Sequence, residues 1–377
     1  MSDLPTDGLA LFSTATGDGT MKVTLEPQVL APLADDELLL RVEATPINPS
    51  DLGLLFGPGD VSTARVDSSA ANPTLVMDIF PHMARMVTAR LDQPMPVGNE
   101  GAGTVVAAGA SAAAQALVGR VVATFGGAMY RKYRVVKVSD AMVLPEGATA
   151  REGASLTVNP LTALSMIATM RREGYSALVH TAAASNLGQM LVRLCQAEGV
   201  QLVNIVRSAE QVAILKGLGA DHVIDSSTPD FFDRLVDALV ATGATLAFDA
   251  IGGGKLAGQI LTAMEAAAAR TGAGFSVYGS TVHKQVYIYG SLDTGPTEFN
   301  RSFGLQWGIG GWLLTPQLMK MPGEVAGMRQ RVIDERNGIF ASHYTADISL
   351  RDMLNPEIAK AYQAKATGTK YLVNPSA

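Results

Sequence analysis

The sequence contains little cysteine, few aromatic residues and little charge. Cys195 is the only cysteine among 377 residues, which excludes an internal disulfide, a four-cysteine zinc lobe and a CxxC redox pair. Aromatic residues make up 6% of the chain and the net charge is −6, so neither base stacking nor clustered positive charge favours a nucleic-acid partner. We expect a buried structural thiol, no nucleic-acid partner and a reducing, cytoplasmic location.

Long apolar runs that could cross a membrane are also missing. The first residues, MSDLPTDGLA, lack the basic region and apolar core of a signal peptide. Residues 302–319 carry no charge, but they include Gln306, Thr315, Pro316 and Gln317, and a spanning helix needs about 20 mainly apolar residues. We interpret this segment as a buried helix or an oligomer interface, and we expect no membrane partner and a homodimer.

Hydrophobic residues make up 47% of the sequence, enough for large buried cores, and a chain of 377 residues predicts two domains. Residues 1–150 read as short strands between Gly and Pro turns, for example at 37–43, 103–106 and 119–123. The connection 60–96 is unusually long. Apolar residues at helical spacing over 74–91 predict an amphipathic surface helix, with a substrate lid as the alternative.

The pattern changes near residue 151, where a helix is predicted over 151–172. Further helices are predicted at 187–198, 209–217, 231–242 and 255–270, and strands at 176–180, 201–206, 222–224, 245–249 and 274–279. Alternating strands and helices predict right-handed βαβ units and a doubly wound parallel sheet, hence an α/β fold. A strand at 370–373 ends the chain, and we expect it to rejoin the β-rich module.

The turn between the first apolar strand and the next helix is the most informative site. It carries Ala183-x-Ser185-x-x-Gly188 where dinucleotide-binding proteins usually have G-x-G-x-x-G. Small residues there let the backbone approach a pyrophosphate at a helix N-terminus. We expect the cofactor to contact Ala183, Ser185, Asn186, Leu187 and Gly188; an ordinary strand-to-helix turn is the alternative.

Arg207 follows the second strand, at the place where NAD enzymes usually carry an acid for the ribose hydroxyls. An arginine can instead pair with a 2′-phosphate through two hydrogen bonds. Arg207, together with Ser208, therefore favours NADPH as the cofactor, with a solvated surface arginine as the alternative.

Five segments now occur in the order typical of one family. They are INPSDL at 47–52, GNEGAG at 98–103, VNPLTA at 158–163, the turn at 179–188 and LGADHVID at 218–225. With them the chain resembles the medium-chain dehydrogenase/reductase superfamily, specifically its zinc-independent quinone oxidoreductase and enoyl reductase branch. The resemblance implies a GroES-like β-rich catalytic domain of residues 1–155 completed by 318–377, a Rossmann domain of residues 156–317, and dimerisation through the Rossmann sheets.

Zinc-dependent relatives hold the metal at positions that match Asn48, Asn99 and Val158 of this chain. None of these is a good zinc ligand, so we expect no metal. By resemblance, Asn48 contacts the nicotinamide ribose or the substrate oxygen, and Thr162 lies near the nicotinamide. The alternatives are a turn-capping asparagine before Pro49 and a helix hydroxyl bonded to the preceding turn.

The residues that end the fourth and fifth predicted strands include Asp249 and the pair Tyr278-Gly279. Carboxyl ends of strands line the ligand crevice in such sheets, so we expect these residues to flank the cofactor. Plain turn chemistry is the alternative, with Asp249 as a helix cap.

Without a Lewis acid, reduction of a conjugated double bond or quinone is easier than oxidation of an alcohol, because the conjugated system spreads the negative charge. We therefore predict a zinc-independent, NADPH-dependent reductase of quinones or α,β-unsaturated carbonyls. A 2-enoyl thioester reductase is the first alternative, although its catalytic tyrosine has no match in residues 54–60. Tyr130 or Tyr133 could replace it in space, or solvent could protonate the enolate. A redox-silent NADPH-binding protein is the second alternative.

Overall fold

The computed structural model describes residues 5–69, 71–273, 276–364 and 367–377. Contacts divide the chain into a first unit, Met1–Val158 with Arg329–Ala377, and a second unit, Asn159–Met328. The sequence places the two changes of domain after residues 155 and 317, whereas the units of the structure change after Val158 and Met328. Each unit is described by itself.

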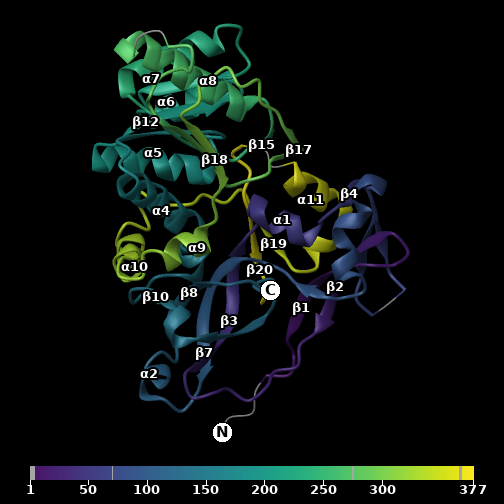
Figure 1. The fold of residues 1–377 in the computed structure, drawn as a ribbon. Helices are drawn as coiled ribbons and strands as arrows, with labels where there is room; N and C mark the ends of the chain where they lie inside the picture. The colour runs from purple at the N-terminus through teal and green to yellow at the C-terminus, as the bar shows by residue number, and fades with distance from the viewer. Residues whose placement is uncertain (1–4, 70, 274–275, 365–366) are drawn as a thin grey trace. The chain divides into compact units, whose positions relative to one another are not determined.

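The first unit contains two mainly antiparallel sheets (Figure 1). One has the order β4-β5-β2-β1-β6, with bounds β1 Leu9–Ala15, β2 Thr20–Pro27, β4 Gly59–Asp67, β5 Thr74–Ile79 and β6 Met95–Pro96. The other has the order β10-β8-β7-β3-β20-β19, and β9 also pairs with β3; its strands are β3 Glu37–Pro46, β7 Glu100–Ala108, β8 Val121–Phe125, β9 Tyr133–Lys137, β10 Met142–Val143, β19 Ala346–Ser349 and β20 Tyr371–Asn374.

Short helices complete this unit. They are α1 Pro49–Leu55, α2 Ala112–Gln115, α3 Ala150–Gly153, α11 Pro356–Gln363, and the 3₁₀ helices η1 Pro81–Arg90, η2 Val138–Asp140 and η4 Asp352–Leu354. The predicted return of the C-terminus is confirmed, because β20 pairs antiparallel with β3 through Leu372 and Val373. Alternate residues of β3, including Leu38, Leu40 and Val42, fill the core between this sheet and α2.

The second unit is built on a parallel sheet with the order β13-β12-β11-β14-β16-β18. The strands are β11 Ala177–His180, β12 Gln201–Val206, β13 His222–Asp225, β14 Leu246–Asp249, β16 Lys284–Ile288 and β18 Trp307–Gly311. A smaller pair is formed by β15 Gly252–Gly254 and β17 Asp293–Thr297. The helices are α4 Val158–Arg172, α5 Asn186–Glu198, α6 Ala209–Gly217, α7 Phe231–Thr242, α8 Leu256–Ala268, the π-helical η3 Ala269–Ala273 and α9 Leu314–Met319; α10 Val325–Asp334 crosses the boundary between the units.

Helices cover both faces of this sheet, which confirms the predicted doubly wound α/β fold. Helices α7 and α8 pack on one face, where Leu235 and Ile260 meet strand residues such as Val179 and Val203. Helix α5 lies on the other side of the strands (Figure 1). Its buried face, with Met190, Leu191 and Leu194 at helical spacing, explains why the sequence predicts this helix well.

Two predicted helices are wrong in extent. The segment 74–91 begins with the strand β5, which pairs with β2 and β4, and continues as η1 only after Pro81. Its apolar residues fit a helical period by chance, and pairing with distant strands decides the structure. The helix predicted over 151–172 is two helices, α3 and α4, with a break at 154–157.

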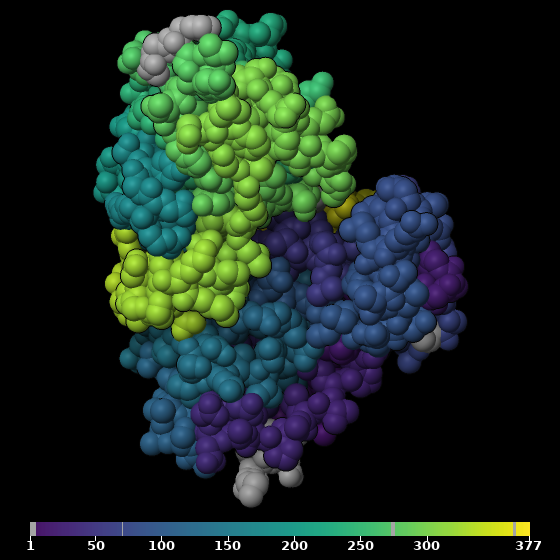
Figure 2. All heavy atoms as spheres, viewed as in Figure 1, coloured from purple at the N-terminus to yellow at the C-terminus, as the bar shows by residue number. Residues whose placement is uncertain are grey.

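Two further expectations near the second sheet are corrected. The predicted strand 274–279 begins on Gly274 and Phe275, which lie outside the described residues, and continues with a turn at Val277-Tyr278; the fifth strand is β16. The uncharged segment 302–319 is not a single helix, because it forms the strand β18 and then α9. Atoms around residues 310–330, in yellow-green, lie on the surface shown in Figure 2.

Candidate functional site

The turn after β11 lies at the point where the strand order of the parallel sheet reverses. From β11 the chain runs outward to β12 and β13, and it then returns to β14 on the other side of β11. Ligand crevices form at such switch points, outside the carboxyl ends of the strands. The turn leads directly into α5, whose N-terminus is capped by Ser185, since its Oγ accepts a hydrogen bond from the Gly188 N–H at 3.2 Å.

The backbone of this turn is packed too tightly for larger side chains. A Cβ on Gly188 would lie 2.1 Å from the carbonyl oxygen of Ala183, so only a glycine at this position lets α5 pack this closely against the turn. Ala182 adopts a φ of +48°, a left-handed conformation that favours glycine, and Ala183 N–H donates to the Ile205 carbonyl at 3.2 Å. The structure therefore brings Ala183, Ser185, Asn186, Leu187 and Gly188 together at one helix N-terminus.

Arg207 and Ser208 follow β12 at the same edge of the sheet. The Arg207 side chain is exposed, and the backbone N–H of Arg207 donates to Gln211 Oε1 at 2.9 Å. Ser208 caps α6 by accepting from the Gln211 N–H. The structure adds Asp225 beside them, because Val206 pairs with Asp225 of β13; the Asp225 carboxylate is buried and accepts from the N–H and the hydroxyl of Ser227.

Asp249 stabilises the turn through hydrogen bonds. Its side chain is fully buried, one oxygen accepts from the Thr181 hydroxyl at 2.7 Å and from the Ile251 N–H at 3.0 Å, and the other accepts from the Gly252 N–H at 3.2 Å. The Thr181 hydroxyl in turn accepts from the Ala250 N–H at 2.8 Å. With both oxygens engaged inside the protein, Asp249 joins the carboxyl ends of β11 and β14.

The expected roles of Tyr278 and Gly279 require a correction. The tripeptide Tyr-Gly-Ser occurs twice, at 278–280 and at 289–291. The first copy precedes β16, at the amino edge of the sheet, where Gly279 packs on Gly304. The second copy follows β16, and Tyr289 N–H donates to the Asp249 carbonyl at 2.9 Å. Tyr289-Gly290-Ser291 therefore occupies the place that sequence reasoning gave to the first copy.

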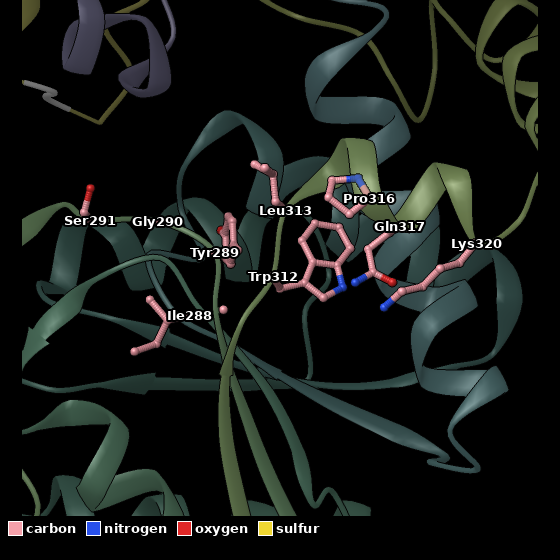
Figure 3. Close-up of a pocket in the computed structure, with 10 residues that line it drawn as sticks. Ile288, Tyr289, Gly290, Ser291, Trp312, Leu313, Pro316, Gln317 and Lys320 are labelled. Carbon is pink, nitrogen blue, oxygen red and sulfur yellow. The ribbon is translucent and has the colours of Figure 1, made fainter. Parts of the chain in front are cut away.

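A pocket of about 480 Å³ lies at the carboxyl ends of β16 and β18, lined among others by Tyr289, Ser291 and Trp312 (Figure 3). The Tyr289 hydroxyl and His180 Nε2 share a hydrogen bond of 2.7 Å, and the two rings stack. Burial lowers the pKa of His180 to about 4, so the imidazole is neutral near pH 7. Sequence reasoning missed this pocket, and the repeated Tyr-Gly-Ser was the one signal available for it.

In the first unit, Asn48 is held by a buried carboxylate. Asn48 Nδ2 donates to Glu100 Oε1 at 2.8 Å, and both side chains are buried. Glu100 Oε2 accepts from the N–H of Thr157 at 3.0 Å, from its hydroxyl at 2.7 Å and from the Val158 N–H at 2.8 Å. These bonds hold the break between α3 and α4, and they fix the orientation of the Asn48 amide. Thr162 is buried on α4, in the second unit.

Two more ionisable groups are buried near Glu100. Asp51 accepts from the backbone N–H groups of Asn48 at 2.8 Å and Asn99 at 2.7 Å, and burial, assisted by the charge of Glu100, raises the pKa of Asp51 to about 7. Among the described residues, Lys370 Nζ is buried without a hydrogen-bond partner, above the Tyr344 ring, and burial lowers the pKa of Lys370 to about 8. Sequence reasoning found neither group, because Asp51 and Lys370 are far apart in the chain.

The two tyrosines considered as proton donors are already engaged. The Tyr130 hydroxyl is buried and donates to the Pro46 carbonyl at 3.1 Å, and burial raises the pKa of Tyr130 well above its usual value. The Tyr133 hydroxyl donates to Asp7 at 3.1 Å. Cys195 is the expected buried thiol, and burial raises its pKa to about 12, which makes the reactive thiolate scarce.

The residues that match zinc ligands by resemblance do not fit zinc. Asn48 and Asn99 present amides, the Asn48 amide is bonded to Glu100, and Val158 has no donor atom on its side chain. Within the described ranges, no three or more His, Cys, Asp or Glu side chains gather closely enough to bind a metal ion. None of the described helices combines the length and apolar character that crossing a bilayer requires.

Comparison with known proteins agrees with this geometry. Residues 187–300 match the model of the zinc-binding dehydrogenase family. A crystal structure described as a candidate NADPH:quinone reductase from Mesorhizobium loti superposes with a TM-score of 0.74 at 24% identity, covering 99% of this chain and 100% of that one. The chain is therefore similar to zinc-binding dehydrogenases over residues 187–300 and shares the fold of this structure over almost its whole length. This similarity agrees with the resemblance seen in the sequence, and the predicted α/β architecture, with a β-rich module and a parallel-sheet module, is confirmed.

Curated relatives match this chain over part of their length. The synaptic vesicle membrane protein VAT-1 homolog of Rattus norvegicus is 32% identical over 168 residues, which is 44% of this chain and 41% of the relative. Prostaglandin reductase-3 of Mus musculus is 29% identical over 61% of this chain and 54% of its own length. The mitochondrial enoyl-[acyl-carrier-protein] reductase of Bos taurus is 26% identical over 55% and 50%. The chain thus spans about half the length of the curated relatives it matches.

Proposed function

We propose that the protein is an NADPH-dependent oxidoreductase that reduces quinones or α,β-unsaturated carbonyls without zinc. The observation that carries this proposal is the turn 181–188, which lies at the switch point of a parallel sheet. The turn consists mainly of small residues, and Gly188 lets the backbone of α5 pack closely against it. The names of the similar proteins support it, since they include quinone, prostaglandin and enoyl reductases.

The second unit offers a partner for each part of the dinucleotide. The N-terminus of α5, with Ala183, Ser185, Asn186, Leu187 and Gly188, suits a pyrophosphate, because the helix dipole and its first N–H groups favour negative charge. The exposed Arg207 and the Ser208 hydroxyl suit a 2′-phosphate. The pocket bounded by Tyr289 and Trp312 suits the nicotinamide, because it lies at the carboxyl ends of the neighbouring strands.

The acceptor class follows from what the chain can stabilise. When bound, NADPH supplies a hydride. Asn48 is a preoriented amide, since Glu100 fixes it, and we assign it to the nicotinamide ribose or to the oxygen that gains negative charge. A conjugated acceptor spreads that charge over several atoms and so needs no metal, in contrast to a simple alcohol, whose oxidation would require a stabilised alkoxide. Thr162 remains a proposed neighbour of the nicotinamide.

A 2-enoyl thioester reductase is the second candidate, favoured by the match to the bovine enoyl reductase. Residues 54–60 contain no tyrosine, and Tyr130 and Tyr133 are bonded elsewhere, so this reading leaves protonation of the enolate to solvent or to another group. Steady-state rates with a crotonyl thioester and with a simple enone separate the two candidates. Binding of NADPH with no reduction of either would favour the third candidate, a redox-silent nucleotide-binding protein.

The 2′-phosphate assignment predicts a selective effect of Arg207→Ala. Loss of the guanidinium removes charge-assisted hydrogen bonds that only NADPH can make, so its dissociation constant rises about tenfold or more while that of NADH changes little. Titrations of both nucleotides by fluorescence measure this selectivity. Arg270→Ala is the matched control, because Arg270 is an exposed arginine of the same unit that pairs with Asp237. Equal losses for both nucleotides would contradict the assignment.

We also propose a homodimer that pairs through β18. β18 is the last strand of the parallel sheet, so one of its edges pairs with no other strand among the described residues. Pairing two copies there would extend the sheet, and light scattering should then give twice the mass of the 39.4 kDa chain. Gly308→Pro, within β18, should shift the mass towards the monomer, and an unchanged dimer would place the interface elsewhere. A cytoplasmic location stays a prediction based on composition.

A further inference from the structure

The pocket at the ends of β16 and β18 extends beyond what a nicotinamide alone would contact. Besides Tyr289 and Trp312, it is lined by Leu313, by Pro316 and Gln317 of α9, and by Lys320, which follows the last residue of that helix (Figure 3). Its volume of about 480 Å³ falls within the range of about 300–1,000 Å³ that small-molecule sites occupy. One end of the pocket is thus formed by strand termini, and the other by α9 and by Lys320 directly after it.

The two aromatic side chains that line the pocket, Tyr289 and Trp312, are fixed by contacts with neighbouring residues. Tyr289 is bonded to His180 at 2.7 Å, and Trp312 Nε1 donates to the Thr169 hydroxyl at 3.3 Å. The Trp312 ring also meets Phe248 edge to face, with centroids 5.5 Å apart. Fixed flat rings of this kind suit a planar, conjugated ligand, because they offer contact area with little loss of side-chain freedom on binding.

The polar end of the pocket presents hydrogen-bond donors. Of the ten residues that line it, Lys320 alone carries a charge. Lys320 has no ion-pair partner in the part of the chain that the structure describes. The Gln317 Oε1 atom already accepts from Arg172 Nη2 at 3.0 Å, so Gln317 offers its amide N–H groups to a ligand. An ammonium and an amide donor together match a group that only accepts hydrogen bonds.

We propose that this pocket selects acceptors that carry a carboxylate, and that Lys320 is the residue that binds it. The inference rests on the proposed function and names its substrate class: a planar enone or quinone with one acidic substituent. One ammonium matches one carboxylate, as a point charge. A coenzyme A thioester, with several phosphate charges, would call for more than one cation, and the pocket has none besides Lys320 among its lining residues.

A matched pair of acceptors tests the proposal. The acid 3-benzoylacrylate and its methyl ester share the same conjugated ketone and differ in charge. The wild-type protein should show the lower KM for the acid, and added salt should raise that KM. Lys320→Met, which keeps the length of the side chain but removes its charge, should shift the acid-to-ester KM ratio about tenfold against the acid. Lys320→Arg keeps the positive charge and should therefore retain most of the preference for the acid over the ester.

The control is Lys360→Met, since Lys360 is an exposed lysine of the first unit that pairs with Glu357, and the KM ratio should not change. An equal KM for acid and ester, or a ratio unmoved by Lys320→Met, would overturn the proposal. The proposal would also be overturned if the protein preferred crotonyl-CoA to the acid and if Lys320→Met raised the KM for crotonyl-CoA, because Lys320 would then bind a phosphate. If neither acceptor is reduced although NADPH binds, the proposed function fails; quenching of Trp312 fluorescence by the acid then tests the pocket separately.

Discussion

At the scale of single residues, two buried carboxylates next to Asn48 have different surroundings. Glu100 accepts four hydrogen bonds from Asn48, Thr157 and Val158, which satisfy its charge. Asp51 accepts two, from backbone N–H groups, and faces the charge of Glu100. Burial therefore raises the pKa of Asp51 to about 7, and the protonation of this one group makes stability depend on pH.

The direction of that dependence follows from the two pKa values. In the unfolded chain Asp51 titrates near its ordinary value of 3.8, and in the folded protein at about 7. Between these values the folded state binds more protons, so its stability falls as pH rises from about 4 to about 7, by about 4 kcal/mol at most. Asp51→Asn should remove this component. Urea unfolding of both proteins between pH 4.5 and 7.5 measures it.

Asp35→Asn is the control for that series, because Asp35 is an exposed aspartate of the same unit. The free energy of unfolding of Asp35→Asn should change with pH in parallel with that of the wild type. The free energy of unfolding of Asp51→Asn should instead rise relative to the wild type as the pH rises. Parallel curves for all three proteins would show that Asp51 is ionised throughout and that its pKa is not raised.

Residue-level prediction from sequence succeeded where chemistry is local. The small residues of the turn 183–188 follow from the need for close backbone approach, and the structure places them at the N-terminus of α5, while their contact with the cofactor stays a prediction. Two Tyr-Gly-Ser copies, by contrast, are identical as text, and only the strand β16 between them separates the amino edge from the carboxyl edge. Lys370 comes within electrostatic range of Asp51 because β20 pairs with β3, a long-range contact that no local sequence pattern indicates.

At the scale of elements, the contact between α5 and the preceding turn is the tightest feature of the candidate site. Gly188→Ala would place a Cβ 2.1 Å from the Ala183 carbonyl, so the helix must move away from the turn. We expect a stability loss of about 1–3 kcal/mol and an NADPH dissociation constant raised about tenfold or more. Gly217→Ala, in α6, is the control, because nothing lies within 4 Å of its Cβ position and alanine favours a helix.

Thermal unfolding and NADPH titration of both variants check this prediction. If Gly188→Ala binds NADPH as well as Gly217→Ala does, the turn is not the pyrophosphate site.

Elements with a strong local period were predicted closely, and elements fixed by distant partners were not. The predicted bounds of β12, α6 and α7 agree with the structure, since each combines an apolar period with a clear start or end signal. Residues 74–79 lacked such signals and became a strand because β2 and β4 lie on either side of it. The break between α3 and α4 depends on Glu100, more than fifty residues earlier in the chain.

At the scale of the whole molecule, we propose one reaction: hydride transfer from NADPH to a conjugated acceptor without a metal. The carboxyl edge of the parallel sheet in the second unit is the proposed dinucleotide site, and Asn48, in the first unit, is the proposed polar contact. One fold can support many chemistries, so the fold alone does not fix the reaction. Turnover is the property that distinguishes an enzyme from a nucleotide-binding protein of the same fold.

The most direct test is the rate of NADPH oxidation, followed by absorbance in the presence of excess chelator. The acceptors are a benzoquinone, a simple enone and a short 2-enoyl thioester. We predict turnover with the quinone or the enone, undiminished by the chelator and slower with NADH. No turnover with any acceptor while NADPH binds, or activity that disappears with the chelator, would contradict this prediction.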